Sequence, residues 1–99
     1  MEREFENRIA VVTGGGSGIG RAVAQRLAAA GADVTIANRS EASGRAVAEE
    51  IGARFVATDV ADEDSIRALI DAVGPRVDVL INAAGLRAAT DVIRPPMRG

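Results

Sequence analysis

Two kinds of hydrophobic spacing alternate along this chain of 99 residues, and the alternation limits the folds that it can adopt. Four short runs of β-branched and apolar residues are expected to form strands, at 9–13, 34–38, 54–58 and 77–82. Stretches with apolar residues at helical intervals separate these runs, such as Ile66, Leu69, Ile70 and Val73 before the fourth. Strands that alternate with helices predict a parallel sheet with right-handed crossovers.

Local signals mark the ends of the three helical stretches. Gly31 follows the first stretch and Gly52 the second, and Gly74-Pro75 ends the third. Asp62 is the predicted N-cap of the third helix, because acidic residues follow it in the first turn. The first and fourth strands are apolar almost throughout, which is typical of strands that are covered on both faces.

These signals predict an α/β fold with a Rossmann-like parallel sheet. Its four strands should lie in the order 3-2-1-4 with three helices, which is half of a doubly wound fold. The helices after the first two strands should cover one face, and the third helix the other. Residues 1–85 are expected to form this half-Rossmann domain. Residues 86–99 lose the periodic pattern and contain Pro95-Pro96, so a loop or irregular tail is expected there.

The segment 13–20 reads TGGGSGIG and joins the first strand to the first helix. Glycine lets a ligand approach the main chain, and the start of a helix offers free N–H groups and the positive end of its dipole to an anion. A strand-to-helix turn can favour glycine for structural reasons alone, but four of the five positions 14–18 are glycine here. The spacing fits neither G-x-G-x-x-G nor the P-loop, which needs a lysine that this chain lacks. The segment is therefore a candidate pyrophosphate site.

Segment 13–20 resembles the T-G-x-x-x-G-I-G signature of the short-chain dehydrogenase/reductase family. Two further segments follow in the family's order. Asp59-Val60, after the third strand, is similar to the family's adenine-contacting Asp-Val. The segment 82–85, after the fourth strand, is similar to Asn-Asn-Ala-Gly, although Ala83 replaces the second Asn. The resemblance covers about residues 6–90.

The resemblance implies a dinucleotide that lies across the carboxyl ends of the strands. It implies that loop 14–20 holds the pyrophosphate, that Asp59 contacts the adenine, and that 82–85 lie against the nicotinamide-side ribose. The cofactor-binding residues that it implies are Thr13, Gly14, Gly16, Ser17, Gly18, Ile19, Gly20, Asp59, Val60, Asn82, Ala83, Ala84 and Gly85. Taken alone, Asp59-Val60 could be an ordinary loop, and Asn82 could merely end a strand.

Two residues at the end of the second strand bear on the choice between NADP and NAD. An acidic residue there would pair with the ribose 2′-OH and repel a 2′-phosphate. This chain has the neutral Asn38 followed by Arg39, and a guanidinium can bind phosphate in a bidentate manner. The sequence therefore predicts NADP as the preferred cofactor and NAD as the alternative. Arg39 could instead be a solvated residue at the start of a helix.

Composition excludes several classes of function. The chain has no Cys and no His, so disulfides, thiol catalysis and the commonest metal ligands are ruled out, and no metal site is predicted. The net charge of −2 and the mixed acidic and basic residues give no indication of nucleic-acid binding. No apolar stretch approaches the ~20 residues of a membrane helix. A soluble, cytoplasmic protein is expected.

The family's catalytic machinery is a Ser with a Tyr-x-x-x-Lys pair, and this chain contains neither Tyr nor Lys. No base can be matched to any of its four serines, Ser17, Ser40, Ser43 and Ser65. The chain is therefore expected to be the cofactor-binding portion of an oxidoreductase. It has no catalytic residues and should be inactive in isolation, whether it is a fragment, a truncated product or a minimal module. A non-enzymatic nucleotide-binding module and a self-associating structural fragment are the alternatives. Nothing in the sequence indicates the substrate.

The fourth strand carries a separate expectation about assembly. In the predicted order it lies at an edge of the sheet, and residues 77–81 read VDVLI without Lys or Pro. An apolar edge strand is a template for another chain. One helix also cannot cover the whole of its face of a four-stranded sheet. We expect a homodimer or a higher homo-oligomer that forms through the fourth strand or the uncovered face.

Overall fold

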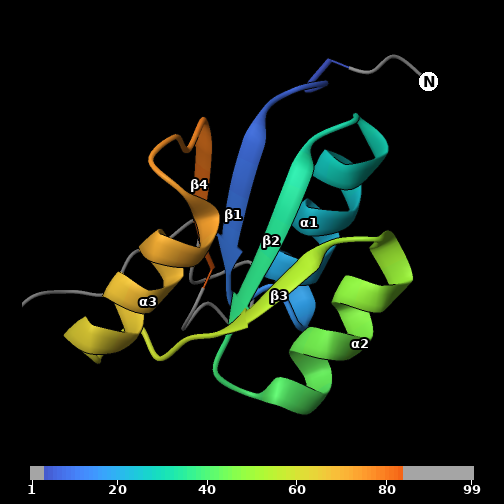
Figure 1. The fold of residues 1–99 in the computed structure, drawn as a ribbon. Helices are drawn as coiled ribbons and strands as arrows, with labels where there is room; N and C mark the ends of the chain where they lie inside the picture. Colours follow the sequence, from blue (N-terminus) through green and yellow to red (C-terminus); the bar gives the residue numbers. More distant parts are fainter. Residues whose placement is uncertain (1–3, 84–99) are drawn as a thin grey trace, which may run out of the picture.

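The computed structural model describes residues 4–83, which fold into a single sheet with helices on both faces (Figure 1). The elements follow the predicted alternation: β1 Ile9–Thr13, α1 Gly18–Ala29, β2 Asp33–Asn38, α2 Glu41–Ile51, β3 Arg54–Ala57, α3 Glu63–Val73 and β4 Val79–Asn82. All strand pairs are parallel, and the strand order is β3-β2-β1-β4. The predicted fold class and strand order are confirmed.

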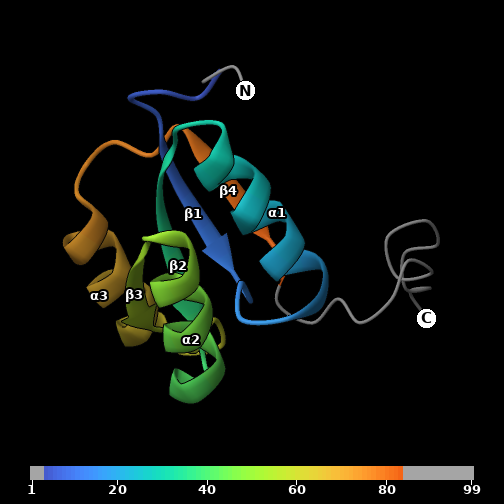
Figure 2. The ribbon, with the colours of Figure 1, turned by 90° about the vertical axis from the view of Figure 1, so that its right-hand side faces the viewer.

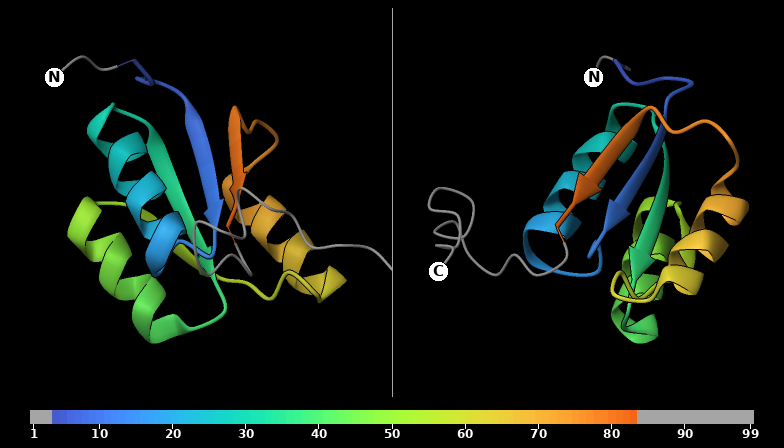
Figure 3. Two further views of the ribbon diagram at one scale, coloured as in Figure 1. Left: turned by 180° about the vertical axis from the view of Figure 1, so that it is seen from behind. Right: turned by 90° about the vertical axis from the view of Figure 1, so that its left-hand side faces the viewer.

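Helices α1 and α2 lie on one face of the sheet and α3 lies on the other (Figures 2 and 3). The first face holds the larger core cluster, which consists of Ala10, Val12, Ala24, Leu27, Val34, Ile36, Val47 and Ala48. The second cluster has only four buried members, Val11, Ala37, Leu69 and Val73. Two helices thus bury one face well, whereas α3 covers only part of the other.

The element boundaries differ from the sequence prediction by one or two residues at three strands. β2 begins at Asp33, β3 ends at Ala57 and β4 begins at Val79 rather than at residue 77. The helices end directly before the predicted stop signals or within two residues of them. Residues Ala84 and Gly85, and the predicted tail 86–99, lie outside the described residues.

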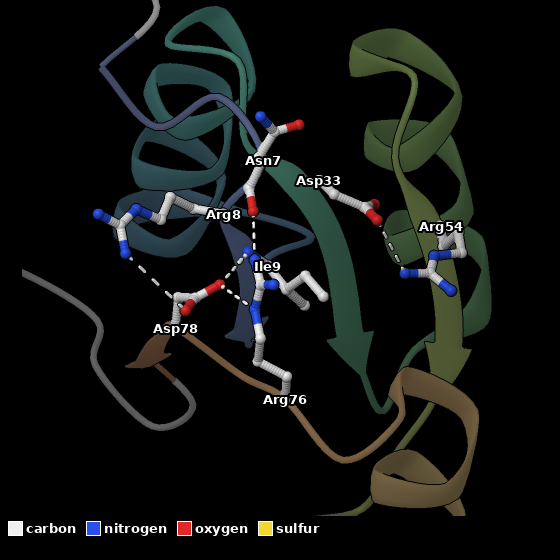
Figure 4. Close-up of polar contacts among 7 residues, drawn as sticks. All are labelled: Asn7, Arg8, Ile9, Asp33, Arg54, Arg76 and Asp78. Carbon is white, nitrogen blue, oxygen red and sulfur yellow. Dashed lines mark hydrogen bonds and ion pairs between the residues drawn. The ribbon is translucent and has the colours of Figure 1, made fainter.

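Directly before β4, Asp78 lies at the centre of a group of contacts at the amino edge of the sheet, where the strands begin (Figure 4). The Asp78 carboxylate accepts hydrogen bonds from the Ile9 N–H at 2.8 Å and from the Arg76 Nε at 3.1 Å. The Asp78 N–H in turn donates to the Ile9 carbonyl at 2.8 Å. Arg8 approaches the same carboxylate at 4.0 Å, and Arg76 also donates to the Asn7 carbonyl. These contacts fasten the start of β1 to the start of β4.

The hydrogen bond from the Ile9 N–H is the main reason that the pKa of Asp78 lies below its ordinary value. Partial desolvation of the carboxyl group opposes this shift, and the hydrogen bond and charge of Arg76 add to it. A second ion pair at the same edge joins Arg54 to Asp33 at 3.2 Å, between β3 and β2 (Figure 4). No helix within residues 4–83 has the length and apolar character to cross a bilayer.

Candidate functional site

The predicted site residues gather at the carboxyl edge of the sheet, at the lower end of the strands in Figure 1. The loop after β1, the turn after β2, the loop after β3 and the residue after β4 all lie there, because parallel strands end at the same edge. The structure therefore brings together four segments that lie up to about 70 residues apart in the sequence. Ala84 and Gly85, which complete the fourth segment, lie outside the described residues.

The glycine loop of residues 14–18 turns sharply away from the sheet. The Gly14 N–H still donates to the Ala37 carbonyl of β2 at 2.8 Å, but its φ of 71° bends the chain out of the strand. The first turn of α1 then packs directly on this bend. A Cβ atom at Gly20 would lie 2.2 Å from the Gly14 carbonyl oxygen and 3.1 Å from the Cβ of Ala83. Only glycine fits at position 20, because the obstacle is backbone.

Helix α1 begins without a side-chain cap, unlike the other two helices. The Ser17 side chain makes no capping hydrogen bond and the first turn of α1 has no acidic residue. In α2 and α3, Ser40 and Asp62 accept from backbone N–H groups, and acidic residues stand in both first turns. Within α1 the first backbone bond runs from the Arg21 N–H to the Ser17 carbonyl at 3.2 Å. The amides of residues 18–20 precede this bond and remain available to an anion.

Gly18 faces open space at this helix start. Its φ is 56°, and a Cβ atom added there would meet nothing within 4 Å. Ser17 and Gly18 are exposed, whereas Ile19 is half-buried. A groove of about 450 Å³ lies beside the loop, lined by Gly16, Ser17, Gly18, Arg21, Ser43, Ala46, Val47 and Glu50. Arg21 and Glu50, which line this groove, form an ion pair at 3.1 Å.

Thr13, Asn82 and Ala83 form the junction between β1 and β4. The buried Thr13 hydroxyl donates to the Asn82 Oδ1 at 2.8 Å, and the Ala83 N–H donates to the Thr13 carbonyl at 3.0 Å. Thr13 is 6% exposed and Ala83 is 5% exposed. These contacts orient the Asn82 side chain and bring the chain after β4 against the start of α1.

The Asn38 side chain uses both of its N–H groups and one of the two acceptor positions of its Oδ1 within the chain. Its Oδ1 accepts from the Gly16 N–H at 3.4 Å, and its Nδ2 donates to the Ser40 carbonyl at 2.8 Å and to the Ser43 hydroxyl at 3.0 Å. Arg39, by contrast, is exposed and has no ion-pair or hydrogen-bond partner among residues 4–83. Of the two residues predicted to lie at the adenosine ribose, only Arg39 has its side chain free for a ligand.

Asp59 shapes the loop after β3 by its own side chain. Its Oδ1 accepts from the Ala61 N–H at 3.0 Å, and its backbone N–H donates to the Ser65 hydroxyl at 2.8 Å. The Thr58 N–H donates to the Asn38 carbonyl at 3.0 Å, so this loop is tied to the end of β2. Val60 is 44% exposed beside it. The loop is thus ordered at the place where the sequence predicted the adenine contact.

Sequence reasoning did not single out Ser43 and Gly44 as neighbours of the loop. A Cβ atom at Gly44 would lie 2.2 Å from the Phe55 Cε1, so the absence of a side chain lets α2 approach β3 closely. A glycine inside a helical pattern is a known signal of such close packing. Ser43 carries no comparable signal, because its importance depends on the position of Asn38. Among the described residues no cluster of three or more acidic, His or Cys side chains could hold a metal ion.

Comparison with known proteins gives a consistent family assignment. The family model for short chain dehydrogenase matches residues 8–95. The 3-hydroxyacyl-CoA dehydrogenase type-2 of Drosophila melanogaster is 41% identical over 91 residues, which cover 86% of this chain and 35% of that protein. The sex determination protein tasselseed-2 of Zea mays is 38% identical over 104 aligned positions, which cover 94% of this chain and 31% of the relative.

Solved structures agree with these sequence matches. A short chain dehydrogenase/reductase family protein is 48% identical with a TM-score of 0.77, over 84% of this chain and 36% of that one. The 3-ketoacyl-(acyl-carrier-protein) reductase of Brucella melitensis, solved in complex with NADH, is 38% identical with a TM-score of 0.74, over 77% of this chain and 33% of that one. The chain spans only 31–40% of the length of the curated relatives that it matches.

Proposed function

This chain belongs to the short-chain dehydrogenase family, and from that membership we propose that it is the cofactor-binding portion of an NAD(P)-dependent oxidoreductase. The observation that carries the proposal is the uncapped, glycine-rich start of α1 at the carboxyl edge of the sheet. Uncapped N–H groups at a helix start suit a pyrophosphate. A nicotinamide dinucleotide is also the ligand class suggested by the relative that was solved with NADH.

The residues present at this edge fit such a cofactor. The amides of Gly18, Ile19 and Gly20 would bind the pyrophosphate over loop 14–20, and the loop of Asp59 and Val60 would lie beside the adenine. The chain after β4, which begins with Ala83, would lie against the nicotinamide-side ribose. When bound, the dinucleotide supplies the site for hydride transfer. This chain's own residues bind and orient it.

NADP is proposed as the preferred form. Asn38 brings no negative charge to the end of β2, and the Arg39 guanidinium is exposed without a partner among the described residues. A guanidinium can hold a phosphate through two charge-assisted hydrogen bonds, which favours the 2′-phosphate of NADP over the 2′-OH of NAD.

Isothermal titration of the chain with NADP⁺ and NAD⁺ tests this proposal. Arg39→Ala should lower the affinity for NADP⁺ about tenfold and leave that for NAD⁺ unchanged, as expected for loss of one hydrogen-bonded charge. Arg26→Ala is the matched control, because Arg26 is also exposed and unpaired within residues 4–83 but lies in the last turn of α1. Binding of neither nucleotide would contradict the function, whereas an unchanged ratio in Arg39→Ala would contradict only the NADP preference.

We propose further that the chain alone catalyses no hydride transfer. The family's catalytic Tyr and Lys have no counterpart in these 99 residues, which contain neither residue type. Oxidation of NADPH that follows the chain through purification, and disappears in Gly20→Ala, would contradict this proposal. The cytoplasmic location expected from the sequence stays a prediction.

A second copy of the chain is the proposed partner. Among the described residues β4 has no neighbour on its outer side, and four apolar side chains are left exposed near it: Leu80 at 64%, Ile70 at 55%, Val60 at 44% and Val77 at 43%. They border a groove of about 580 Å³ between α3 and β4. An unpaired edge beside an apolar groove favours symmetric pairing with an identical chain.

Light scattering at micromolar concentrations tests this assembly. The wild-type chain should have the mass of a dimer or larger species, and Leu80→Lys should shift it to a monomer. Ala22→Lys, which puts the same charge on an exposed position of α1, should leave the mass unchanged. A wild-type monomer at every concentration would overturn the proposal.

A further inference from the structure

The glycine loop meets the end of β2 and the start of α2, which lie 22 or more residues further along the chain. Gly16 comes from the loop, Asn38 from the end of β2 and Ser43 from the first turn of α2. The Asn38 amide joins the other two, because its Oδ1 accepts from the Gly16 N–H at 3.4 Å and its Nδ2 donates to the Ser43 hydroxyl at 3.0 Å. Its second Nδ2 hydrogen goes to the Ser40 carbonyl at 2.8 Å. We call Asn38 and Ser43 the loop clamp.

The loop also packs closely against this clamp. The contact of Gly16 with Asn38 is long for a hydrogen bond, but a Cβ atom at Gly16 would lie only 2.7 Å from the Asn38 Nδ2 and 2.8 Å from the Ser43 hydroxyl oxygen. It would also lie 3.0 Å from the Gly44 nitrogen. The main chain of the loop is therefore seated directly against both clamp side chains, with no room for a side chain between them.

The clamp is itself held in place by the packing of α2 on β3. Gly44 has no side chain, and a Cβ atom there would meet the Phe55 ring at 2.2 Å and the Cβ of Asn38 at 2.9 Å. The Arg45 guanidinium lies over the same ring, 5.1 Å from its centroid. The close packing of α2 on β3 and on the end of β2 thus fixes the positions of both Ser43 and Asn38.

The chemistry of the amide group explains why asparagine suits this position. Asn38 must accept from one neighbour and donate to an acceptor-only neighbour, the Ser40 carbonyl, and an amide can do both. A carboxylate would set an oxygen 2.8 Å from the Ser40 carbonyl oxygen, where two acceptors repel. Both N–H groups of the amide are engaged within the chain, so it has no donor left over for a ribose.

We propose that Asn38 and Ser43 are positioning residues that hold the glycine loop in the conformation that binds dinucleotides. This inference rests on the proposed function, since it names what orients the loop of that same site. The clamp fixes the Gly16 amide, and the loop then presents the amides of residues 18–20 to the pyrophosphate. Because NAD and NADP share the pyrophosphate, loss of the clamp weakens both to the same extent. A residue that read the ribose would instead change their ratio.

The test is titration of the full chain with NAD⁺ and NADP⁺ in the variants Asn38→Ala and Ser43→Ala. Asn38→Ala removes the one side-chain hydrogen bond to the loop, and Ser43→Ala removes one that orients Asn38. Each variant should therefore bind both nucleotides about three- to tenfold more weakly, with an unchanged ratio. Ser40→Ala is the matched control. It removes the N-cap of α2 but keeps the Ser40 carbonyl that Asn38 needs, so it should lower stability and leave both affinities unchanged.

A second readout does not depend on nucleotide binding. Hydrogen exchange of the Gly16 amide, measured by NMR without nucleotide, should speed up in both clamp variants and not in Ser40→Ala. Wild-type affinity in the clamp variants, or a changed NADP⁺ to NAD⁺ ratio in Asn38→Ala, would overturn the positioning role. If the wild type binds neither nucleotide, the proposed function fails. In that case the exchange data still test whether Asn38 and Ser43 hold the loop. An unchanged exchange rate of the Gly16 amide in both variants would overturn that claim too.

Discussion

The amino and carboxyl edges of the sheet differ in whether a side chain accepts a hydrogen bond from their free backbone N–H groups. At the amino edge, the Asp78 carboxylate accepts the free N–H of Ile9, and the neighbouring arginines neutralise its charge. At the carboxyl edge, the amides that open α1 have no capping side chain and no acidic residue beside them. The same chain thus satisfies its backbone at one edge and leaves N–H groups open at the other. We call the carboxyl edge the open edge, because its free N–H groups suit a ligand. We call the amino edge the closed edge, because its contacts stabilise the fold.

Gly20→Ala should have the largest effect on the open edge. A Cβ atom would lie 2.2 Å from the Gly14 carbonyl oxygen, so the loop must shift. We expect the affinity for NADP⁺ and NAD⁺ to fall at least tenfold, and the free energy of unfolding to fall by about 1–3 kcal/mol from overpacking. Titration calorimetry measures the first and urea unfolding the second. Circular dichroism is the suitable probe, because the chain has no Trp or Tyr.

Gly52→Ala is the control for this prediction. Gly52 caps α2 with a φ of 73°, and a Cβ atom there would meet nothing within 4 Å. The left-handed conformation should cost an alanine about 1–2 kcal/mol of stability without touching the loop. If Gly20→Ala binds both nucleotides as tightly as Gly52→Ala does, the loop is not the ligand site.

Asp78→Asn should affect the closed edge alone. An amide cannot replace the carboxylate toward two guanidinium groups, so the free energy of unfolding should fall at pH 7, while both nucleotide affinities stay at the wild-type value. Asp71→Asn is the matched control, because Asp71 is exposed in α3 and has no partner within residues 4–83. A loss of nucleotide binding in folded Asp78→Asn would show that the two edges are coupled, and would break the comparison.

The lowered pKa of Asp78 predicts that the stability of the folded chain depends on pH. The pKa of this carboxyl group in the folded chain is lowered below the ordinary value of 3.8, chiefly by the hydrogen bond from the Ile9 N–H. Its contribution to stability is therefore fully present above about pH 4 and is lost as the pH falls through the lowered pKa. Urea midpoints of the wild type and Asp78→Asn should differ at pH 6 and converge in strongly acidic solution. A constant difference across this range would contradict the assignment.

The fold was predictable from the sequence because each strand and helix is specified by residues close together in the chain. Helical spacing of Ile66, Leu69 and Val73 and the stop at Gly74 need no knowledge of other elements. The roles of Asn38 and Asp78 were not predictable in this way. The role of Asn38 depends on a hydrogen bond with Gly16, 22 residues away. The role of Asp78 depends on a hydrogen bond with Ile9, 69 residues away. Asp78 was instead expected inside an apolar strand, because the run 77–82 reads as continuous.

Candidate site residues were predictable to the level of their place in the fold. Parallel strands bring the ends of β1, β2, β3 and β4 to one edge, so the four segments were expected to meet. Which side-chain atoms remain free at that edge is a different question. It depends on hydrogen bonds such as those of Asn38 and Asp59, which follow from the packing of α2 and α3.

Asp33→Asn should have the smallest effect on the free energy of unfolding. It allows two aspartates of the closed edge to be compared with each other. It makes the same chemical change as Asp78→Asn at the same edge, and it removes the ion pair with Arg54 at 3.2 Å. The Asp33 side chain is 56% exposed, whereas that of Asp78 is 19% exposed. An exposed pair is screened by water and salt, so the free energy of unfolding should change by less than about 0.5 kcal/mol and not at all in 1 M NaCl. Urea unfolding of both variants side by side at pH 7 measures the difference. If Asp33→Asn destabilised the chain as much as Asp78→Asn, net charge at this edge would matter more than the hydrogen bond to Ile9. The stability of the closed edge would then come from attraction between charges rather than from hydrogen bonds to its free backbone N–H groups.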